Sequence, residues 1–160
     1  MKKNLLGAFI VLVMLAATNS SFCVPNSLPG YEKILTSFID SYTKSDYKKL
    51  NDILSDDACV KIPRAEKVII QRKSSLVDEM REEKGTMQAC TSKYEVIAHT
   101  DAIVIARVDF QYENFKEQNF VTLEKNDNKE WKITQICKVF QNTDKPVAPL
   151  GNNSMSAKIN

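Results

Sequence analysis

Apolar residues recur along the chain with two different periods, and the change of period separates a helical first part from a strand-rich second part. Between residues 31 and 42 they fall at intervals of three and four, which predicts one amphipathic helix of about three turns. Ser45 is a candidate N-cap for a second, short helix over residues 47–54. Ser75, with an aspartate three residues later, resembles a capping box and predicts a third helix that closes at Gly85.

Alternation of apolar and polar residues predicts strands in the remaining segments. Two short strands are expected between and beside the helices, at residues 58–62 and 68–70. Four longer strands are expected at about residues 87–99, 102–112, 118–125 and 131–140. Their short connections indicate an antiparallel meander, so the chain belongs to the α+β class.

The two ends of the chain differ in composition from the segment between them. Residues 1–23 have two lysines followed by an apolar run of about 13 residues, which is typical of a signal peptide and too short for a transmembrane helix. We therefore expect a periplasmic or secreted protein. Phe22 stands where a lipoprotein signal needs a small residue, which disfavours a lipid anchor on Cys23. Residues 24–29 form a lead-in, residues 30–140 one domain, and residues 141–160 a disordered tail rich in Asn, Ser and Pro.

Charge and cysteine content exclude several classes of function. The chain has 22 basic and 20 acidic residues, and the leader contains two of the lysines. A balanced mature chain argues against nucleic acid as a partner. Neither a Cys–His pair at ligand spacing nor a glycine-rich phosphate loop occurs, so we expect no metal and no cofactor. Two states are compatible with the three remaining cysteines: one disulfide and one free thiol, or three free thiols. These cysteines are Cys59, Cys90 and Cys137.

The order of elements, with the residues that mark them, resembles the nuclear transport factor 2-like superfamily, including its SnoaL-like and putative lumazine-binding bacterial families. The resemblance rests on the opening helix, on Lys44-Ser45-Asp46, on the 102–112 strand and on Trp131-Lys132-Ile133. It implies a cone, in which a curved sheet wraps around the three helices and encloses a pocket. It also implies that the last strand lies beside the first, which would bring Cys59 near Cys137. Members of this superfamily include isomerases, dehydratases, hydrolases and binding domains, so the fold alone does not define an activity.

The 102–112 strand has one wholly apolar face. Val104, Ala106, Val108, Phe110 and Tyr112 should face the helices, while Arg107, Asp109 and Gln111 should lie on the outer surface. The outer surface often makes dimers in this superfamily, so a homodimer through the sheet face is expected. The inner face of this strand has no acid or base, which argues against catalysis.

Two residues are alternative catalytic candidates. His99 ends a strand beside a turn, where an exposed hairpin histidine is the simpler interpretation. Asp109 could turn inward only through a bulge, and no glycine marks one. Either residue would support an isomerase, dehydratase or hydrolase.

Aromatic residues are the candidates for binding. The leading hypothesis is a non-catalytic exported domain that binds a small apolar or aromatic molecule, and a dimerising interaction module is the third alternative. Tyr42 and Tyr112 combine a ring with a hydroxyl near the end of an element. The full set of predicted ligand-binding residues is Tyr42, Tyr112, Phe110, Phe38 and Tyr94.

Overall fold

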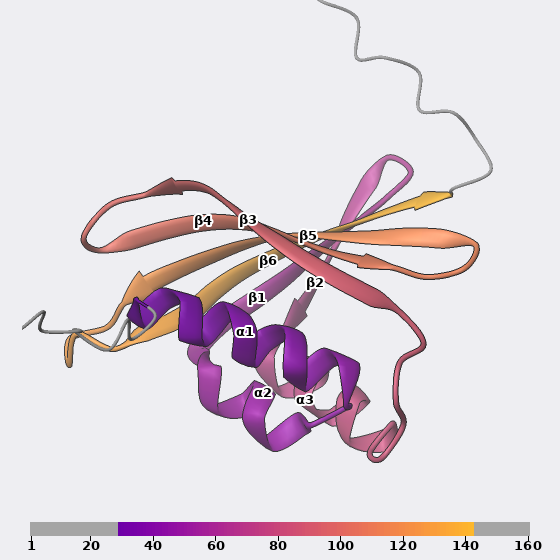
Figure 1. Cartoon of the computed structure of the whole chain (residues 1–160), viewed down its shortest axis with the longest axis horizontal. Coiled ribbons are helices and arrows are strands. Elements are labelled where there is room, and N and C mark those ends of the chain that lie inside the picture. Colours follow the sequence, from indigo (N-terminus) through magenta and orange to yellow (C-terminus); the bar gives the residue numbers. More distant parts are fainter. Residues whose placement is uncertain (1–28, 143–160) are drawn as a thin grey trace, which may run out of the picture.

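The computed structural model describes residues 29–142 and shows three helices followed by most of a six-stranded sheet (Figure 1). The first two strands lie between the second and third helices in the chain. The predicted signal peptide, most of the predicted lead-in and residues 143–160 lie outside the described residues. The helices are α1 (Gly30–Thr43), α2 (Tyr47–Ile53) and α3 (Lys73–Glu82).

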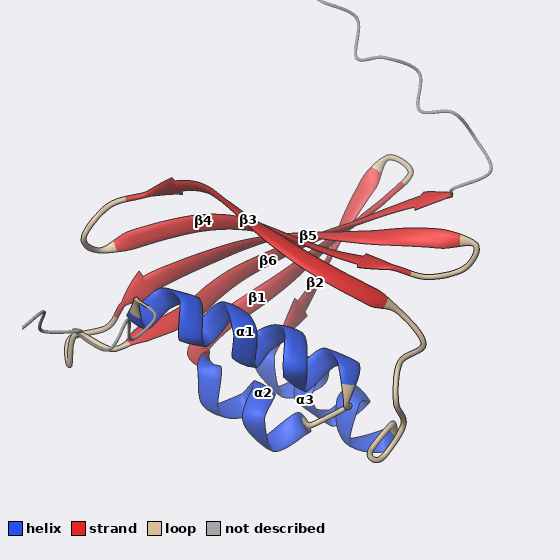
Figure 2. Cartoon of the chain, viewed as in Figure 1, coloured by secondary structure: helices blue, strands red, loops and turns tan. Residues whose placement is uncertain are grey.

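All six strands form one curved, unclosed sheet in the order β2-β1-β6-β5-β4-β3 (Figure 2). Every neighbouring pair is antiparallel except β1 and β6, which are parallel, so the last strand lies beside the first as expected. The predicted α+β cone is therefore confirmed. The strands are β1 (Leu54–Arg64), β2 (Lys67–Arg72), β3 (Thr91–His99), β4 (Ile103–Gln111), β5 (Phe115–Lys125) and β6 (Trp131–Asn142).

The helices gather on one face of the sheet, and within residues 29–142 no helix covers the opposite face (Figure 1). Their apolar stripes pack against the inner sheet face, because one side of each element has to be buried. Leu35 and Phe38 of α1 and Leu50 of α2 are fully buried there. Burying one such side chain stabilises the fold by roughly 1.5–3 kcal/mol.

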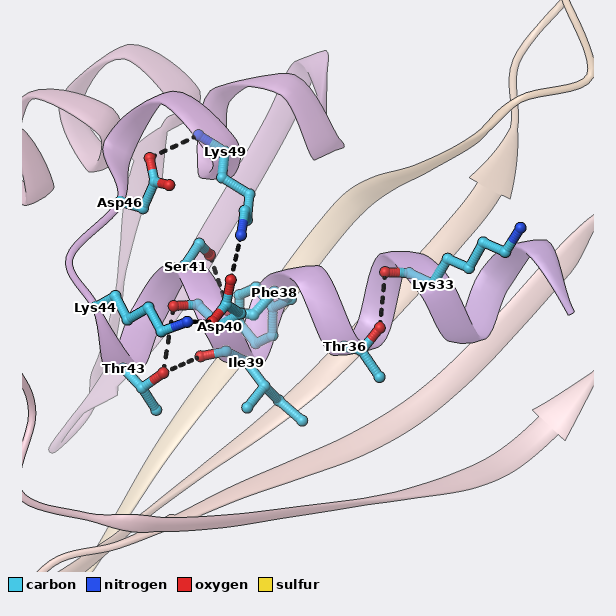
Figure 3. Close-up of polar contacts among 10 residues, drawn as sticks. All are labelled: Lys33, Thr36, Phe38, Ile39, Asp40, Ser41, Thr43, Lys44, Asp46 and Lys49. Atoms are coloured by element: carbon cyan, nitrogen blue, oxygen red, sulfur yellow. Dashed lines mark hydrogen bonds and ion pairs between the residues drawn. The ribbon is translucent and has the colours of Figure 1, made fainter. Parts of the chain in front are cut away.

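A tight turn joins α1 to α2, and here the predicted N-cap is wrong by one residue. Asp46 is the cap, since its side chain accepts a hydrogen bond of 3.1 Å from the backbone N–H of Lys49 (Figure 3). Ser45 instead makes the turn, with a left-handed φ of 49° and a buried side chain. Asp40 of α1 binds both Lys44 and Lys49, which ties the two helices together.

The third helix also begins and ends elsewhere than predicted. It starts at Lys73, so Ser75 lies inside the helix, and the residue before it makes no side-chain cap. It ends at Glu82, before the predicted stop at Gly85. Gly85 does adopt a φ of 86°, which favours glycine, but in the loop beyond the helix.

Strand boundaries differ from the predictions mainly where polar residues belong to strands. The first strand begins at Leu54, although the apolar pattern predicts that Leu54 belongs to the second helix. Leu54 is the C-cap of α2 and its backbone is already extended, so the strand starts where the helix ends. Strand β5 begins at Phe115 rather than at residue 118. Gln141 and Asn142 pair with Lys116 and Phe115, so the sheet extends two residues into the segment predicted to be a tail.

The start of α1 is fixed against the sheet by Trp131. Gly30 lies so close that a Cβ atom there would be 2.9 Å from Trp131 Cδ1. Tyr31 meets the same ring edge-on, with 5.9 Å between ring centroids. A residue larger than glycine at position 30 would therefore displace the helix or the tryptophan.

Candidate functional site

The inner face of β4 is apolar, as the alternation predicts, and it continues across the sheet. Val104, Ala106, Val108 and Phe110 are at most 1 % exposed. Antiparallel pairing places Val121 of β5 opposite Ala106 and Ile136 of β6 opposite Val121. These side chains form the core together with Leu123, Ile133, Leu35 and Phe38.

On the neighbouring strands β5 and β6, the inner face changes from apolar to polar along the length of the strand. Glu117 and Asn119 precede Val121 at alternate positions of β5, and Lys138 of β6 lies opposite Asn119. The Asn119 amide donates to Glu117 Oε1 at 3.0 Å, and Lys138 Nζ lies 3.5 Å from the same oxygen. Lys138 Nζ also lies over the ring of Tyr42 from α1, 4.7 Å from its centroid.

The inner face of β4 has no acid or base, as expected, but this polar cluster places a carboxylate and an ammonium elsewhere in the interior. That expectation came from β4 alone, whereas the charges come from β5 and β6. Glu117 is 7 % exposed and Asn119 is fully buried. We call Tyr42, Tyr112, Glu117, Asn119 and Lys138 the polar cluster.

Burial controls protonation within the polar cluster. It raises the pKa of Tyr42 and of Tyr112, because an ionised phenol would be poorly solvated there. It also raises the pKa of the Cys90 thiol beside Tyr112. For Lys138 burial alone would lower the pKa, but the neighbouring Tyr42 and Glu117 outweigh it and hold the pKa above its ordinary value. At neutral pH the cluster therefore contains a charged ammonium and neutral phenols.

Two buried oxygen atoms of the cluster form no hydrogen bond of standard geometry among residues 29–142, although Lys138 lies close to one of them. They are Tyr42 Oη and Asn119 Oδ1. The orientation of the amide follows from its neighbour: a carboxylate only accepts, so Asn119 has to turn Nδ2 toward Glu117 and Oδ1 away. An unpaired buried polar atom costs roughly 1–3 kcal/mol, so these two oxygens need an explanation.

Beyond the polar cluster the inner face becomes aromatic. Tyr112 stacks on Phe115 with 4.4 Å between centroids, and Phe115 contacts Phe140 at 6.4 Å. The guanidinium of Arg64 lies over Phe140, 5.4 Å from its centroid. Phe140 is 43 % exposed, so solvent reaches this aromatic rim, which we define as Tyr112, Phe115, Phe140 and Arg64.

The structure brings together four of the five predicted aromatic residues. Phe38, Tyr42 and Phe110 contact one another with centroids 4.7–6.2 Å apart. Tyr112 joins them through its shared neighbours Glu117 and Lys138. Tyr94 lies apart on the edge strand, near Tyr31 and Glu32 at the start of α1.

Neither alternative catalytic residue lies in the polar cluster. His99 is exposed at the end of β3, where it stacks on Tyr31 with centroids 6.2 Å apart. Asp109 lies on the outer face, as expected, although it is only 3 % exposed. There Lys116, Arg107 and Gln118 contact its carboxylate at 2.9, 3.6 and 3.0 Å. Burial opposes ionisation, but these groups outweigh it and lower the pKa of Asp109.

All three described cysteines are free thiols. Cys59 and Cys137 do lie on adjacent strands, as the resemblance implied, but Cys59 pairs with Gln135 and Cys137 with Lys61. They are therefore two residues out of register. The strand spacing and this offset together exceed the Cα separation that a disulfide allows.

Five surface pockets of the described residues leave out four of the five predicted aromatic residues. Of five pockets with volumes of about 150–360 Å³ among residues 29–142, one includes Tyr94 and none includes the other four predicted residues. The largest, about 360 Å³, lies between α2 and the turn after β5. Its two lysines, Lys73 and Lys132, already bind the backbone carbonyls of Leu54 and Asp52.

The sequence prediction missed Glu117, Asn119 and Lys138, although a signal was present. Glu117 and Asn119 share the parity of Val121 and Leu123, so a strand begun at residue 115 would have turned both inward. The prediction began this strand at residue 118 and left Glu117 in a loop.

Within the described part of the chain no helix is long and apolar enough to cross a bilayer. No three metal-binding side chains gather there either.

The fold is that of solved proteins described as NTF2-like, that is, nuclear transport factor 2-like. A search of solved structures found an NTF2-like protein of unknown function from Silicibacter pomeroyi, with a TM-score of 0.60 and 10% identity over 70% of this chain and 93% of the other. A protein of the same description from Methylobacillus flagellatus has a TM-score of 0.57 and 19% identity, over 71% and 89%. A ketosteroid isomerase-like protein from Erwinia carotovora atroseptica has a TM-score of 0.51 and 11% identity, over 71% and 94%.

The family is defined by sequence as well. A family model described as "Putative lumazine-binding" matches residues 29–141, so the chain belongs to that family. A search of curated proteins found no match to this chain. The family description suggests a ligand-binding domain.

Proposed function

We propose that the protein is an exported, non-catalytic domain that binds a small aromatic molecule between the aromatic rim and the polar cluster. One observation carries the proposal: solvent-accessible aromatic rings lie next to two buried oxygens, Tyr42 Oη and Asn119 Oδ1, that have no partner among the described residues. A planar ligand would stack at the rim and offer hydrogen-bonding groups to these oxygens.

The state of Glu117 favours binding over catalysis. Its Oε1 atom is shared by Lys138 and Asn119. The ammonium and the amide both contact Oε1, so one of the two carboxylate oxygens is already occupied by partners within the chain. The pair brings no net charge, which suits an uncharged ligand.

An enzyme of the isomerase, dehydratase or hydrolase kind is the second candidate. The inward position of Glu117 favours it, because a buried carboxylate is what such chemistry needs. Glu117 then replaces His99 and Asp109 as the residue to test. Turnover of a bound molecule that stops in Glu117→Gln would support the enzyme, whereas unchanged bound material supports the binding domain.

The binding proposal is tested first on protein purified from its own host. Native mass spectrometry should show a bound small molecule, which Tyr112→Ala should lose. Titration calorimetry with lumazine, the molecule in the family description, is the first defined probe. Tyr47→Phe is the matched control, since Tyr47 contacts Arg81 away from the cluster. Equal occupancy in Tyr112→Ala and in wild type would refute a site at the rim.

Export is proposed from the leader alone. Cell fractionation should place the processed protein in the periplasm or medium, and Cys23→Ser should behave as wild type. Membrane retention that Cys23→Ser abolishes would instead establish a lipid anchor.

Homodimerisation through the sheet face also stays a proposal. Arg107 and Asp109 bind each other and bind Glu95 and Lys116 within the chain, so they are less available to a partner than expected. The exposed residues of this face that could still make the contact include Ile103, Ile105 and Gln111.

A further inference from the structure

Strand β2 forms one edge of the sheet and is unusually apolar. Within residues 29–142 it pairs with β1 alone. Val68, Ile69 and Ile70 are consecutive and are 56 %, 44 % and 59 % exposed. Edge strands with exposed backbone groups and apolar side chains are templates for another strand, and soluble proteins normally protect them with charges, prolines or bulges.

The opposite edge has this protection. Strand β3 presents Lys93 and Glu95, and its register against β4 shifts between Val96 and Ala98. The pairing of β2 with β1, in contrast, runs without a shift from Cys59–Arg72 to Arg64–Lys67. The geometry of β2 is therefore regular enough to accept another strand.

The sequence of β2 is complementary to itself in one antiparallel register. If Ile69 of two copies lie opposite each other, Val68 meets Ile70 twice, and Glu66, in the turn just before β2, comes level with Arg72 twice. Opposite residues of antiparallel strands lie on the same face, so Val68 and Ile70 would touch, while the long side chains of Glu66 and Arg72 would meet at the ends of the paired strands. Both Glu66 and Arg72 are exposed, and neither forms an ion pair within residues 29–142.

The neighbouring registers are worse. Centring the pair between Ile69 and Ile70 sets Lys67 opposite Arg72, which places like charges together. Centring it between Val68 and Ile69 sets Arg72 opposite Ala65 and removes both Glu–Arg pairs.

We propose that a second copy of this chain docks on β2, antiparallel and centred on Ile69, and joins the two sheets edge to edge. The contact has twofold symmetry, since each strand uses the same residues. It leaves the interior of each domain unchanged, so it holds whether or not the rim binds a ligand.

Charge exchange at the exposed pair tests the register directly. Sedimentation velocity of the purified protein over a range of concentrations should show a dimer. Glu66→Arg or Arg72→Glu alone should raise the dissociation constant about tenfold, because each creates two like-charge pairs. The double variant Glu66→Arg/Arg72→Glu should restore wild-type association. Circular dichroism checks that the folds are equal.

Three results would overturn the proposal. The first is a wild-type monomer at every concentration, and the second is a dimer that the charge exchange leaves unchanged but Ile105→Lys on the sheet face dissociates. The third is a monomer that dimerises only after residues 143–160 are removed, since the chain's own end would then be the occupant. Rescue by the double variant is the result that supports it.

Discussion

The interior of the domain has two halves with different chemistry. In the apolar half, Val104, Leu123 and Ile133 pack with no exposure and no polar atom to satisfy. In the polar half, Glu117 and Lys138 hold opposite charges, and two oxygens have no partner in the described chain. The same two strands, β5 and β6, contribute to both halves, so position along the strand makes the difference.

The contrast indicates which half the fold depends on. Apolar burial is favourable by itself, whereas buried ions must recover a desolvation penalty of several kcal/mol each through mutual attraction. A polar half is therefore a poor source of net stability, although removing one member of it is costly. Sites that break the rules of core packing in this way are where binding functions are expected.

The largest effect is expected from leaving Glu117 without its ammonium. Lys138→Met should lower the free energy of unfolding by about 4 kcal/mol, because the carboxylate stays buried and loses its counter-ion. The double variant Lys138→Met/Glu117→Leu should recover most of this loss. Urea denaturation followed by circular dichroism measures both. Lys49→Met is the control, since its pair with Asp40 is half-exposed and should be worth less than about 1 kcal/mol. Equal losses in Lys138→Met and Lys49→Met would remove the distinction between the halves.

A slightly smaller loss is expected in the apolar half. Leu123→Ala should cost about 3 kcal/mol, since Leu123 is fully buried and its removal leaves a cavity. Ligand occupancy should not change, because Leu123 lies away from the rim. Denaturation and native mass spectrometry test the two statements separately. Loss of the ligand from a folded Leu123→Ala protein would show that the halves are not independent.

Local pattern was enough to predict the class of fold and the apolar wall. The alternation on β4 predicts that Val104 and every second residue up to Phe110 face inward and that Asp109 faces outward, because a strand has a strict period of two. The helix boundaries were less predictable. Ser45 and Asp46 are both good caps by composition, and only the left-handed turn at Ser45 decides between them.

The polar cluster could not be assembled in the same way. It joins residues from α1, β5 and β6, and the pairing of Asn119 with Lys138 depends on a register that no local pattern specifies. Glu117 was also hidden by its neighbours, since Lys116-Glu117-Gln118 has the composition of a loop. The positions of Tyr42 and Tyr112 were easier to anticipate, because an aromatic ring near an element's end suits both packing and binding.

Alkaline pH should weaken the fold through the polar half. Burial raises the pKa of Tyr42 and Tyr112, so the folded protein holds protons that the unfolded chain releases above pH about 10. The unfolded state then binds fewer protons, and stability falls as pH rises, by up to about 1.4 kcal/mol per pH unit for each tyrosine. Denaturation midpoints between pH 9 and pH 11 measure the slope. Tyr42→Phe should make it shallower, and an unchanged slope would contradict the role of Tyr42.

The smallest change in stability should come from the hydroxyl of Tyr42 at neutral pH. Tyr42→Phe removes a buried oxygen that has no partner in the described chain, so without ligand the free energy of unfolding should rise by about 1 kcal/mol. Ligand affinity should fall about tenfold, the ordinary value of one lost hydrogen bond in a buried site. Calorimetry with the bound molecule and urea denaturation give the two numbers from one preparation.

A binding site is distinguished from core packing by comparing the change in the free energy of unfolding with the change in ligand affinity. A core hydroxyl with an internal partner would cost stability when removed, whereas an oxygen reserved for a ligand costs affinity alone. Tyr47→Phe should change neither, since the half-buried Tyr47 ring contacts Arg81 at 5.3 Å and lies away from the polar cluster. If Tyr42→Phe destabilised the protein by more than about 1 kcal/mol with affinity intact, the hydroxyl would have an internal partner. The polar half would then serve the fold rather than a ligand.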